Sequence, residues 1–239
     1  MELNYNFLNK LFTVLNASEI EYCILRGYEG LPNEVSNDVD FGVSKDSLTS
    51  FFDLLIFLSK EYGYSINISL IRDSVIKMSL SNIDGTSLMI DVWWNFNLLG
   101  LRYTCISRLL KSKEMYNNSF YVPSKEHEFA LSFLKELLHN NWIRKDKIEL
   151  LKSKITQDYY LPFHDYFSIS IVDEFVHSVM SNKHKITFIS LKAKIQLVYH
   201  NIRRHGIIKV IINVKSFFMI KYFYKEQYSY LYNPKIKNV

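Results

Sequence analysis

The chain has 239 residues, of which 48% are hydrophobic and 15% aromatic. This length and composition exclude a disordered chain and fit one large domain or two small ones. Two cysteines, Cys23 and Cys105, provide no disulfide framework and no cysteine cluster for a metal, and they indicate buried thiols in a reducing compartment. The first twelve residues lack the basic start and unbroken apolar stretch of a secretory signal, so we expect a cytoplasmic protein.

The net charge of +5 is unevenly distributed along the chain. Residues 183–239 hold twelve Lys and Arg against one acid, Glu226, whereas residues 1–182 hold 17 Lys and Arg against 23 acids. A basic tail on an acidic body can attract nucleic acid, anionic lipid or a polyanionic substrate. The alternative interpretation is that these cations are only a solvated surface.

The first half of the chain alternates helical and extended patterns. Apolar residues at helical spacing from Leu3 to Leu15 predict a helix that ends near residues 16–18. A second helix begins after Ser44, which can serve as its cap. Short apolar or alternating runs predict five strands, over residues 21–26, 38–43, 64–71, 75–82 and 87–94. The last two strands are joined by a turn at residues 83–85.

The second half of the chain has a helical pattern. Six of the seven glycines lie at or before Gly100, and glycine marks the turns between strands. Helices are expected from Ser124 to about residue 140 and around residues 145–155, 165–180 and 186–204. We therefore predict an α+β fold, in which a first half of strands and helices is followed by a helical second half. The predicted domains are residues 1–110 and residues 111–239, the second with the basic tail.

Residues 207–224 form a very apolar segment. Lys209, Lys215 and Lys221 interrupt it, which disfavours a membrane-spanning helix. An apolar helix must be covered, and packing in the protein core is the favoured interpretation. A partner protein or a lipid surface is the alternative.

Three carboxylates on predicted strands are the candidate site. Asp38 and Asp40 stand two apart, so their side chains point to the same face of a strand. Like charges side by side raise each other's proton affinity, and an ionised pair needs a cation nearby. Asp91, between Ile90 and Val92 on a later strand, is costly to bury without a partner. The alternative is that the first two are ordinary loop acids.

The order of these residues resembles the nucleotidyltransferase superfamily related to DNA polymerase β. The resemblance lies in Leu25–Arg26–Gly27 at the end of a strand, a loop of about ten residues, and Ser36–Asn37–Asp38–Val39–Asp40 leading into the next strand. It covers about residues 20–95, and the sequence LRGYEGLP is similar to uncharacterised bacterial nucleotidyltransferase-like proteins. Some of those proteins accompany genes for polysaccharide or other surface assembly.

The resemblance implies a nucleotidyltransferase-like mixed sheet with flanking helices, and a catalytic and metal-binding role for Asp38, Asp40 and Asp91. It also implies that Arg26, Gly27 and Ser36 contact the nucleotide. The implied cofactors are two magnesium ions about 3.5–4 Å apart, with a nucleoside triphosphate (NTP) as donor. The implied reaction moves a nucleoside monophosphate (NMP) onto a hydroxyl- or phosphate-bearing acceptor, which we expect to be a small molecule or a glycan. Nucleic acid is a less favoured acceptor, and residues 183–239 are expected to contact a membrane surface or a protein.

Several alternatives remain open from the sequence. Family members commonly carry serine after the strand-ending glycine, whereas Tyr28 follows Gly27 here, so an inactive scaffold or nucleotide sensor is the second hypothesis. A glycosyltransferase with a D-x-D motif is disfavoured, because that motif usually follows several βα units. Trp93 and Trp94 are interpreted as core or strand-face aromatics and not as platforms for base stacking.

Overall fold

The computed structural model describes residues 2–35, 37–72, 74–104, 106–163 and 166–223. Ser36, one of the predicted nucleotide contacts, and Cys105 lie outside these residues, as does the end of the basic tail from residue 224. The described chain is a mixed α+β structure, which confirms the predicted fold class.

The chain forms two compact units that alternate along the sequence. The described residues of the first unit are 2–35, 37–72, 74–95, 106–123 and 217–223, and those of the second are 96–104, 124–163 and 166–216. The predicted boundary lies after residue 110, whereas residues 106–123 together belong to the first unit. The predicted domains themselves stay a prediction. The hairpin at 114–122 packs on the first helix and strand of the first unit, whereas the hairpin at 96–104 packs on a helix of the second.

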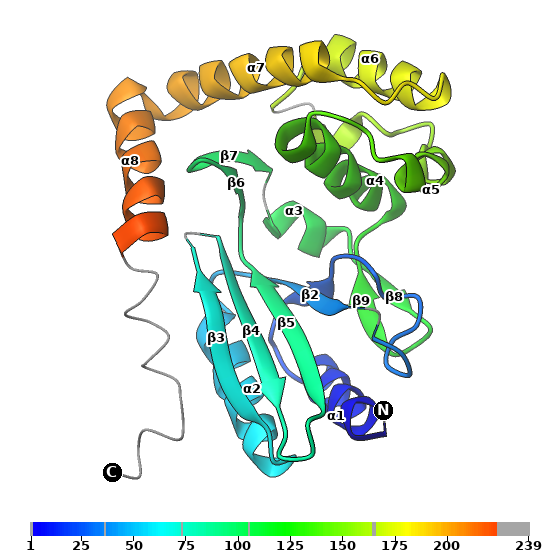
Figure 1. Ribbon diagram of the computed structural model, residues 1–239, viewed down its shortest axis with the longest axis vertical. Coiled ribbons are helices and arrows are strands. Elements are labelled where there is room, and N and C mark those ends of the chain that lie inside the picture. Colours follow the sequence, from blue (N-terminus) through cyan, green and yellow to red (C-terminus); the bar gives the residue numbers. More distant parts are fainter. Residues whose placement is uncertain (1, 36, 73, 105, 164–165, 224–239) are drawn as a thin grey trace. The chain divides into compact units, whose positions relative to one another are not determined.

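The first unit is built around a five-stranded sheet (Figure 1). Its helices and strands are α1 (Glu2–Ala17), β1 (Tyr22–Ile24), β2 (Asp38–Val43), α2 (Leu48–Glu61), β3 (Ser65–Ile71), β4 (Val75–Ser81), β5 (Ser87–Trp93), α3 (Ile106–Lys111), β8 (Glu114–Tyr116) and β9 (Phe120–Val122). The strand order is β1-β2-β5-β4-β3. Only β2 and β5 run parallel; the other neighbours are antiparallel.

Alternation along the central strands separates an apolar face of the sheet from a polar one. Val39, Phe41 and Val43 of β2 are fully buried and join the core with α1 and α2, which lie on one face of the sheet (Figure 1). Because successive side chains point to opposite faces, Asp38 and Asp40 lie on the other face. The helices therefore bury one side of the sheet and leave its acidic side for other contacts.

The second unit is mainly helical. It contains β6 (Phe96–Leu98), β7 (Leu101–Thr104), α4 (Lys125–Leu134), η1 (Lys135–Asn140), η2 (Lys145–Lys147), α5 (Ile148–Lys154), η3 (Leu161–Phe163), α6 (Ile169–Met180), α7 (Thr187–His205) and most of α8 (Ile207–Phe223). Phe133 anchors its core, with ring centroids 4.6 Å from Phe163 and 4.2 Å from Phe175. The segment η1 is a π-helix that continues α4, so one predicted helix changes its hydrogen-bond spacing near its end.

The expectation that the protein core covers the apolar segment 207–224 is wrong for the described part of α8. Val210 is buried, but Ile207, Ile208, Ile211 and Ile212 are exposed. Among the described residues, no helix combines the length and the apolar character that crossing a membrane requires.

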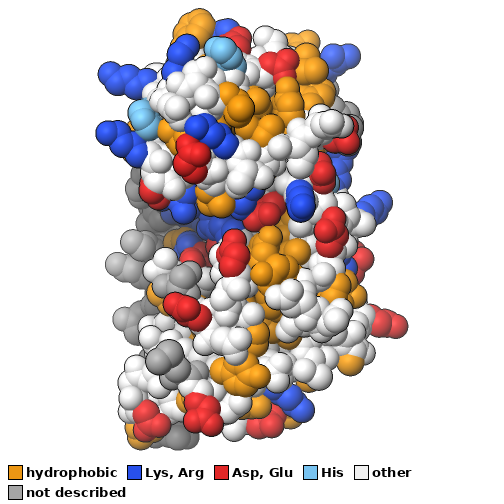
Figure 2. All heavy atoms as spheres, turned by 90° about the vertical axis from the view of Figure 1, so that its right-hand side faces the viewer, with side chains coloured by type: hydrophobic (Ala, Val, Ile, Leu, Met, Phe, Trp, Pro, Cys, Tyr) orange, Lys and Arg blue, Asp and Glu red, His pale blue; other side chains and the backbone are white. Residues whose placement is uncertain are grey.

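Helix α7 also carries exposed apolar side chains, on the side away from its buried residues. Ser190, Ala193, Leu197 and Asn201 are buried at helical spacing. Phe188, Leu191, Ile195 and Tyr199 are exposed at the same kind of spacing. No acid occurs between residues 183 and 223. By contrast, the face drawn in Figure 2 has acidic as well as basic side chains around its apolar patches.

Phe41 lies on the apolar face of β2, the strand that carries Asp38 and Asp40 on its other face. Removing its ring tests the assignment of the core. Its ring lies 5.1 Å from that of Phe51 and 6.3 Å from those of Phe12 and Tyr22, measured between centroids. Phe41→Ala should lower the free energy of unfolding by about 3–5 kcal/mol, because it leaves a cavity in a dense core. Phe57→Ala on α2, where the side chain is 65% exposed, should change it by less than about 1 kcal/mol. Urea unfolding followed by circular dichroism measures both, and equal losses would contradict the assigned core.

Candidate metal-binding site

The parallel pairing of β2 and β5 brings the three predicted carboxylates together. Asp40 lies directly beside Asp91 in the strand register, and Asp38 lies two residues earlier on the same face. Each of the three offers an oxygen within 4.8 Å of the others. Asp40 and Asp91 are each only 1% exposed, and Asp38 is partly buried. Three hard oxygen donors at this spacing suit a divalent cation such as Mg²⁺.

Asp40 is held by two side chains that donate hydrogen bonds. Arg26, just after β1, donates from Nε to Asp40 Oδ2 at 2.5 Å and from Nη2 to Oδ1 at 3.2 Å. Trp93 donates from Nε1 to Oδ1 at 2.9 Å. A carboxylate has about four lone-pair positions, so a metal ion on Asp40 would use the remaining position or displace one of these donors. Burial lowers the pKa of Arg26, but the charge of Asp40 and its hydrogen bond raise that pKa overall.

Asp91 is paired with a lysine on the next strand. Lys77 lies directly opposite it in the antiparallel register of β4 and β5, and Lys77 Nζ donates a hydrogen bond to Asp91 Oδ2. Burial raises the pKa of Asp91, the contact with Lys77 opposes that rise, and the nearby charges of Asp40 and Asp38 add to it. The carboxyl group is therefore poorly solvated and depends on its cationic neighbour.

The charges in this cluster do not balance. Asp38, Asp40 and Asp91 bring three negative charges when ionised, and Arg26 and Lys77 bring two positive ones. One negative charge remains on a largely buried face, where an unpaired charge is costly. A bound cation is one way to compensate it, so the donor set and its charge both fit a divalent ion.

The end of β1 differs from the predicted phosphate-binding turn at one position. Gly27 has φ +65°, a backbone conformation that favours glycine, and no heavy atom lies within 4 Å of where a Cβ would be. The next residue, Tyr28, is buried, with its ring centroid 4.9 Å from that of Tyr116. The position that holds serine in the family pattern thus contributes to an aromatic core.

Two residues of the site were not identified from the sequence. Trp93 was interpreted as an aromatic of the core or strand face, but its indole N–H contacts Asp40. Lys77 was not predicted, although the turn expected at residues 83–85 indicates which residues of the two strands lie opposite each other. Asp84 lies at the centre of that turn, and Lys77 and Asp91 lie seven residues before and after it. The structure brings together Asp38, Asp40, Asp91 and Arg26; the roles of these residues and of Gly27 stay predictions.

Comparison with known proteins gives only distant similarities. No family model matches the chain, and no curated protein matches it. Among solved structures, JHP933 from Helicobacter pylori is 12% identical, with a TM-score of 0.40 over 89% of this chain and 97% of that one. The polymerase core of TRAMP, an RNA surveillance complex, is 12% identical, with a TM-score of 0.27 over 83% of this chain and 55% of that one. Such distant likenesses carry no argument about activity, which has to rest on the site itself.

Lys77→Met tests the ion pair with Asp91. It leaves a buried carboxylate without its cation and should lower the free energy of unfolding by about 1–3 kcal/mol at pH 7, in buffer without divalent ions. Lys152→Met, which removes a partner from the 82% exposed Glu149, should cost less than about 1 kcal/mol.

The pH dependence of the Lys77→Met loss has a definite sign. Without Lys77 the folded-state pKa of Asp91 rises further above its unfolded value of about 4. The loss of unfolding free energy therefore grows as the pH rises above this value, where Asp91 ionises, and shrinks below it. Urea unfolding at several pH values measures this, and a loss that is constant with pH would contradict the pairing.

Proposed function

We propose that this chain is a metal-dependent nucleotidyltransferase, which moves an NMP from an NTP onto a hydroxyl- or phosphate-bearing acceptor. The convergence of Asp38, Asp40 and Asp91 on the polar face of the sheet is the observation that carries the proposal. The order of these acids after Gly27 is the sequence feature on which the resemblance rests, and the positive φ of Gly27 is compatible with a turn there.

The proposed metal site uses all three carboxylates. Asp38 and Asp40 would hold the pair of magnesium ions, and Asp91 would complete the ligand set. When bound, the ions supply charge that stabilises the attacking and leaving oxygens of an in-line displacement. Trp93 and Lys77 act as positioning residues, because their hydrogen bonds fix the carboxylates of Asp40 and Asp91.

The nucleotide would bind beside the end of β1. Gly27 has an exposed backbone without a side chain, which lets a phosphate approach its amide. Arg26 is partly exposed and adds a positive charge next to this turn. Ser36, which precedes β2, is the third proposed contact. A small-molecule or glycan acceptor, as in surface-polysaccharide assembly, is our first choice of acceptor, and nucleic acid is the second.

Asparagine substitutions test the proposed chemistry. Asp40→Asn and Asp91→Asn keep the side-chain shape but remove charge, and each should lower Mg²⁺-dependent NMP transfer about 100-fold or more, because metal stabilisation contributes several kcal/mol. Asp84→Asn, in the turn between β4 and β5, should leave transfer unchanged. The assay follows label from α-labelled NTPs into small-molecule and glycan pools, together with pyrophosphate release. Full transfer by the Asp40 and Asp91 variants would refute the mechanism.

A second candidate function is an inactive scaffold or nucleotide sensor that docks on a partner or a membrane surface. Three observations favour it. Tyr28 is part of the aromatic core, Arg26 and Lys77 already pair with two of the acids, and α7 and α8 expose apolar side chains in a segment without acids. Basic amphipathic helices of this kind bind anionic lipid surfaces.

The second candidate predicts either no Mg²⁺-linked NTP binding, for a scaffold, or nucleotide binding without pyrophosphate release, for a sensor. It also predicts co-sedimentation with vesicles that contain phosphatidylserine, and Ile208→Glu with Ile211→Glu on α8 should reduce that binding at least about tenfold. Phe57→Glu, at another exposed apolar position, is the matched control and should bind like the original chain. Efficient NMP transfer together with no vesicle binding would rule out this candidate.

A further inference from the structure

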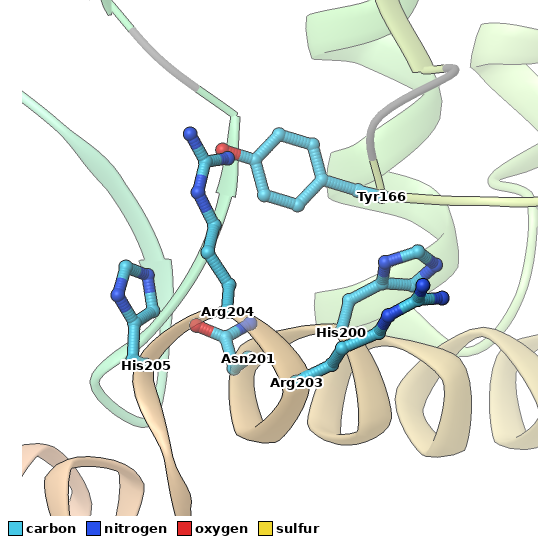
Figure 3. A pocket seen from close by; sticks show the side chains of 6 residues that line it. All are labelled: Tyr166, His200, Asn201, Arg203, Arg204 and His205. Atoms are coloured by element: carbon cyan, nitrogen blue, oxygen red, sulfur yellow. The ribbon is translucent and has the colours of Figure 1, made fainter.

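A pocket of about 300 Å³ lies beside the end of α7 in the second unit. Five of the residues that line it come from the last two turns of α7, and Tyr166 faces them (Figure 3). The five are His200, Asn201, Arg203, Arg204 and His205. Four of the five are arginines or histidines. Arg204 extends from the helix toward Tyr166 (Figure 3).

The arginines of this pocket differ from several other cations of the same unit. Elsewhere, Arg144 contacts Glu136, Lys154 contacts Glu128, and Lys192 contacts Glu174. In the part of the chain that the structure describes, no acid pairs with Arg203 or Arg204. Both arginines line the pocket and are exposed, with Arg204 extending toward Tyr166 and Arg203 toward His200 (Figure 3).

Positive charge reaches the pocket from more than one element. Desolvation lowers the pKa of His205, and the charges of Arg204, of Arg102 on β7 and of Lys209 on α8 lower it further. Cations in the last turn of a helix are favoured by its dipole. That preference applies to the basic residues of α7, whereas Arg102 and Lys209 lie outside the lining but close enough to act on His205.

The pocket also has a fixed wall. Asn201 is buried, and its Nδ2 donates hydrogen bonds to the backbone oxygens of Leu197 at 2.9 Å and Arg102 at 3.0 Å. These bonds tie β7 to α7 directly at the lining residues. A ligand would meet arginines that start from a rigid helix, which lowers the entropic cost of binding.

We propose that this pocket binds the phosphate group of a small phosphomonoester. A guanidinium group presents paired N–H donors that match phosphate oxygens. Two arginines carry two positive charges, which match a phosphate dianion better than they match the single charge of a carboxylate ligand. The volume lies at the lower end for small-molecule sites, so it fits a phosphate with a small organic group. The proposal concerns a site of the second unit and does not depend on the proposed activity of the acidic cluster.

Calorimetry on the full chain tests the proposal with glycerol 3-phosphate and inorganic phosphate, and with uncharged glycerol as the ligand control. Glycerol 3-phosphate should bind saturably, and Arg203→Gln or Arg204→Gln should weaken it at least about tenfold, because each removes charge-assisted hydrogen bonds. Lys192→Gln removes the same charge from the same helix away from the lining and should change the affinity less than about twofold.

Further variants and a lipid probe separate the explanations. Arg204→Lys keeps the charge but loses the planar donor pair, so it should bind more weakly than the original chain, and it serves as the test if the glutamine variants fail to fold. Equal weakening by Lys192→Gln would show general electrostatic attraction and overturn the proposal. Binding to vesicles that contain phosphatidic acid, without binding to soluble glycerol 3-phosphate, would assign the surface to lipid and also overturn it.

Discussion

The parallel pairing of β2 with β5 is the constraint on which the candidate site depends. It sets Asp40 beside Asp91 while the opposite faces of the same strands are buried against helices. Two buried carboxylates in adjacent strands repel each other, and Asp38 adds a third charge. Arg26, Trp93 and Lys77 surround them because such a cluster is tolerated only when nearby donors and cations solvate it.

The two compact units carry uncompensated charges of opposite sign. On the sheet of the first unit, three carboxylates exceed the cations that contact them. At the end of α7 in the second, Arg203 and Arg204 line a pocket without acidic partners among the described residues. The proposed ligands are a divalent cation for the largely buried acids of the first unit and a phosphate group for the exposed arginines of the second.

Long periodic segments were predictable, and short ones were not. The helices over α1, α2, α6 and α7 and the strands of the five-stranded sheet lie close to their predicted ranges, because their apolar residues repeat with a clear period. The hairpins β6–β7 and β8–β9 and the short helix α3 were not predicted. These segments are short and lack a clear apolar period, and they are stabilised by the elements against which they pack.

Alternation within each strand is a property of the sequence by itself. Alternation determined that Asp38 and Asp40 share a face, and composition along the chain determined that Asp91 lies in an apolar run and that a basic tail follows an acidic body. Only the tertiary structure decided which side chains contact those acids. Strand order and register selected Lys77 and Trp93, and folding placed Tyr28 in the core. These contacts join residues far apart in sequence, and pairing between strands is determined by packing of the whole sheet rather than by any local pattern.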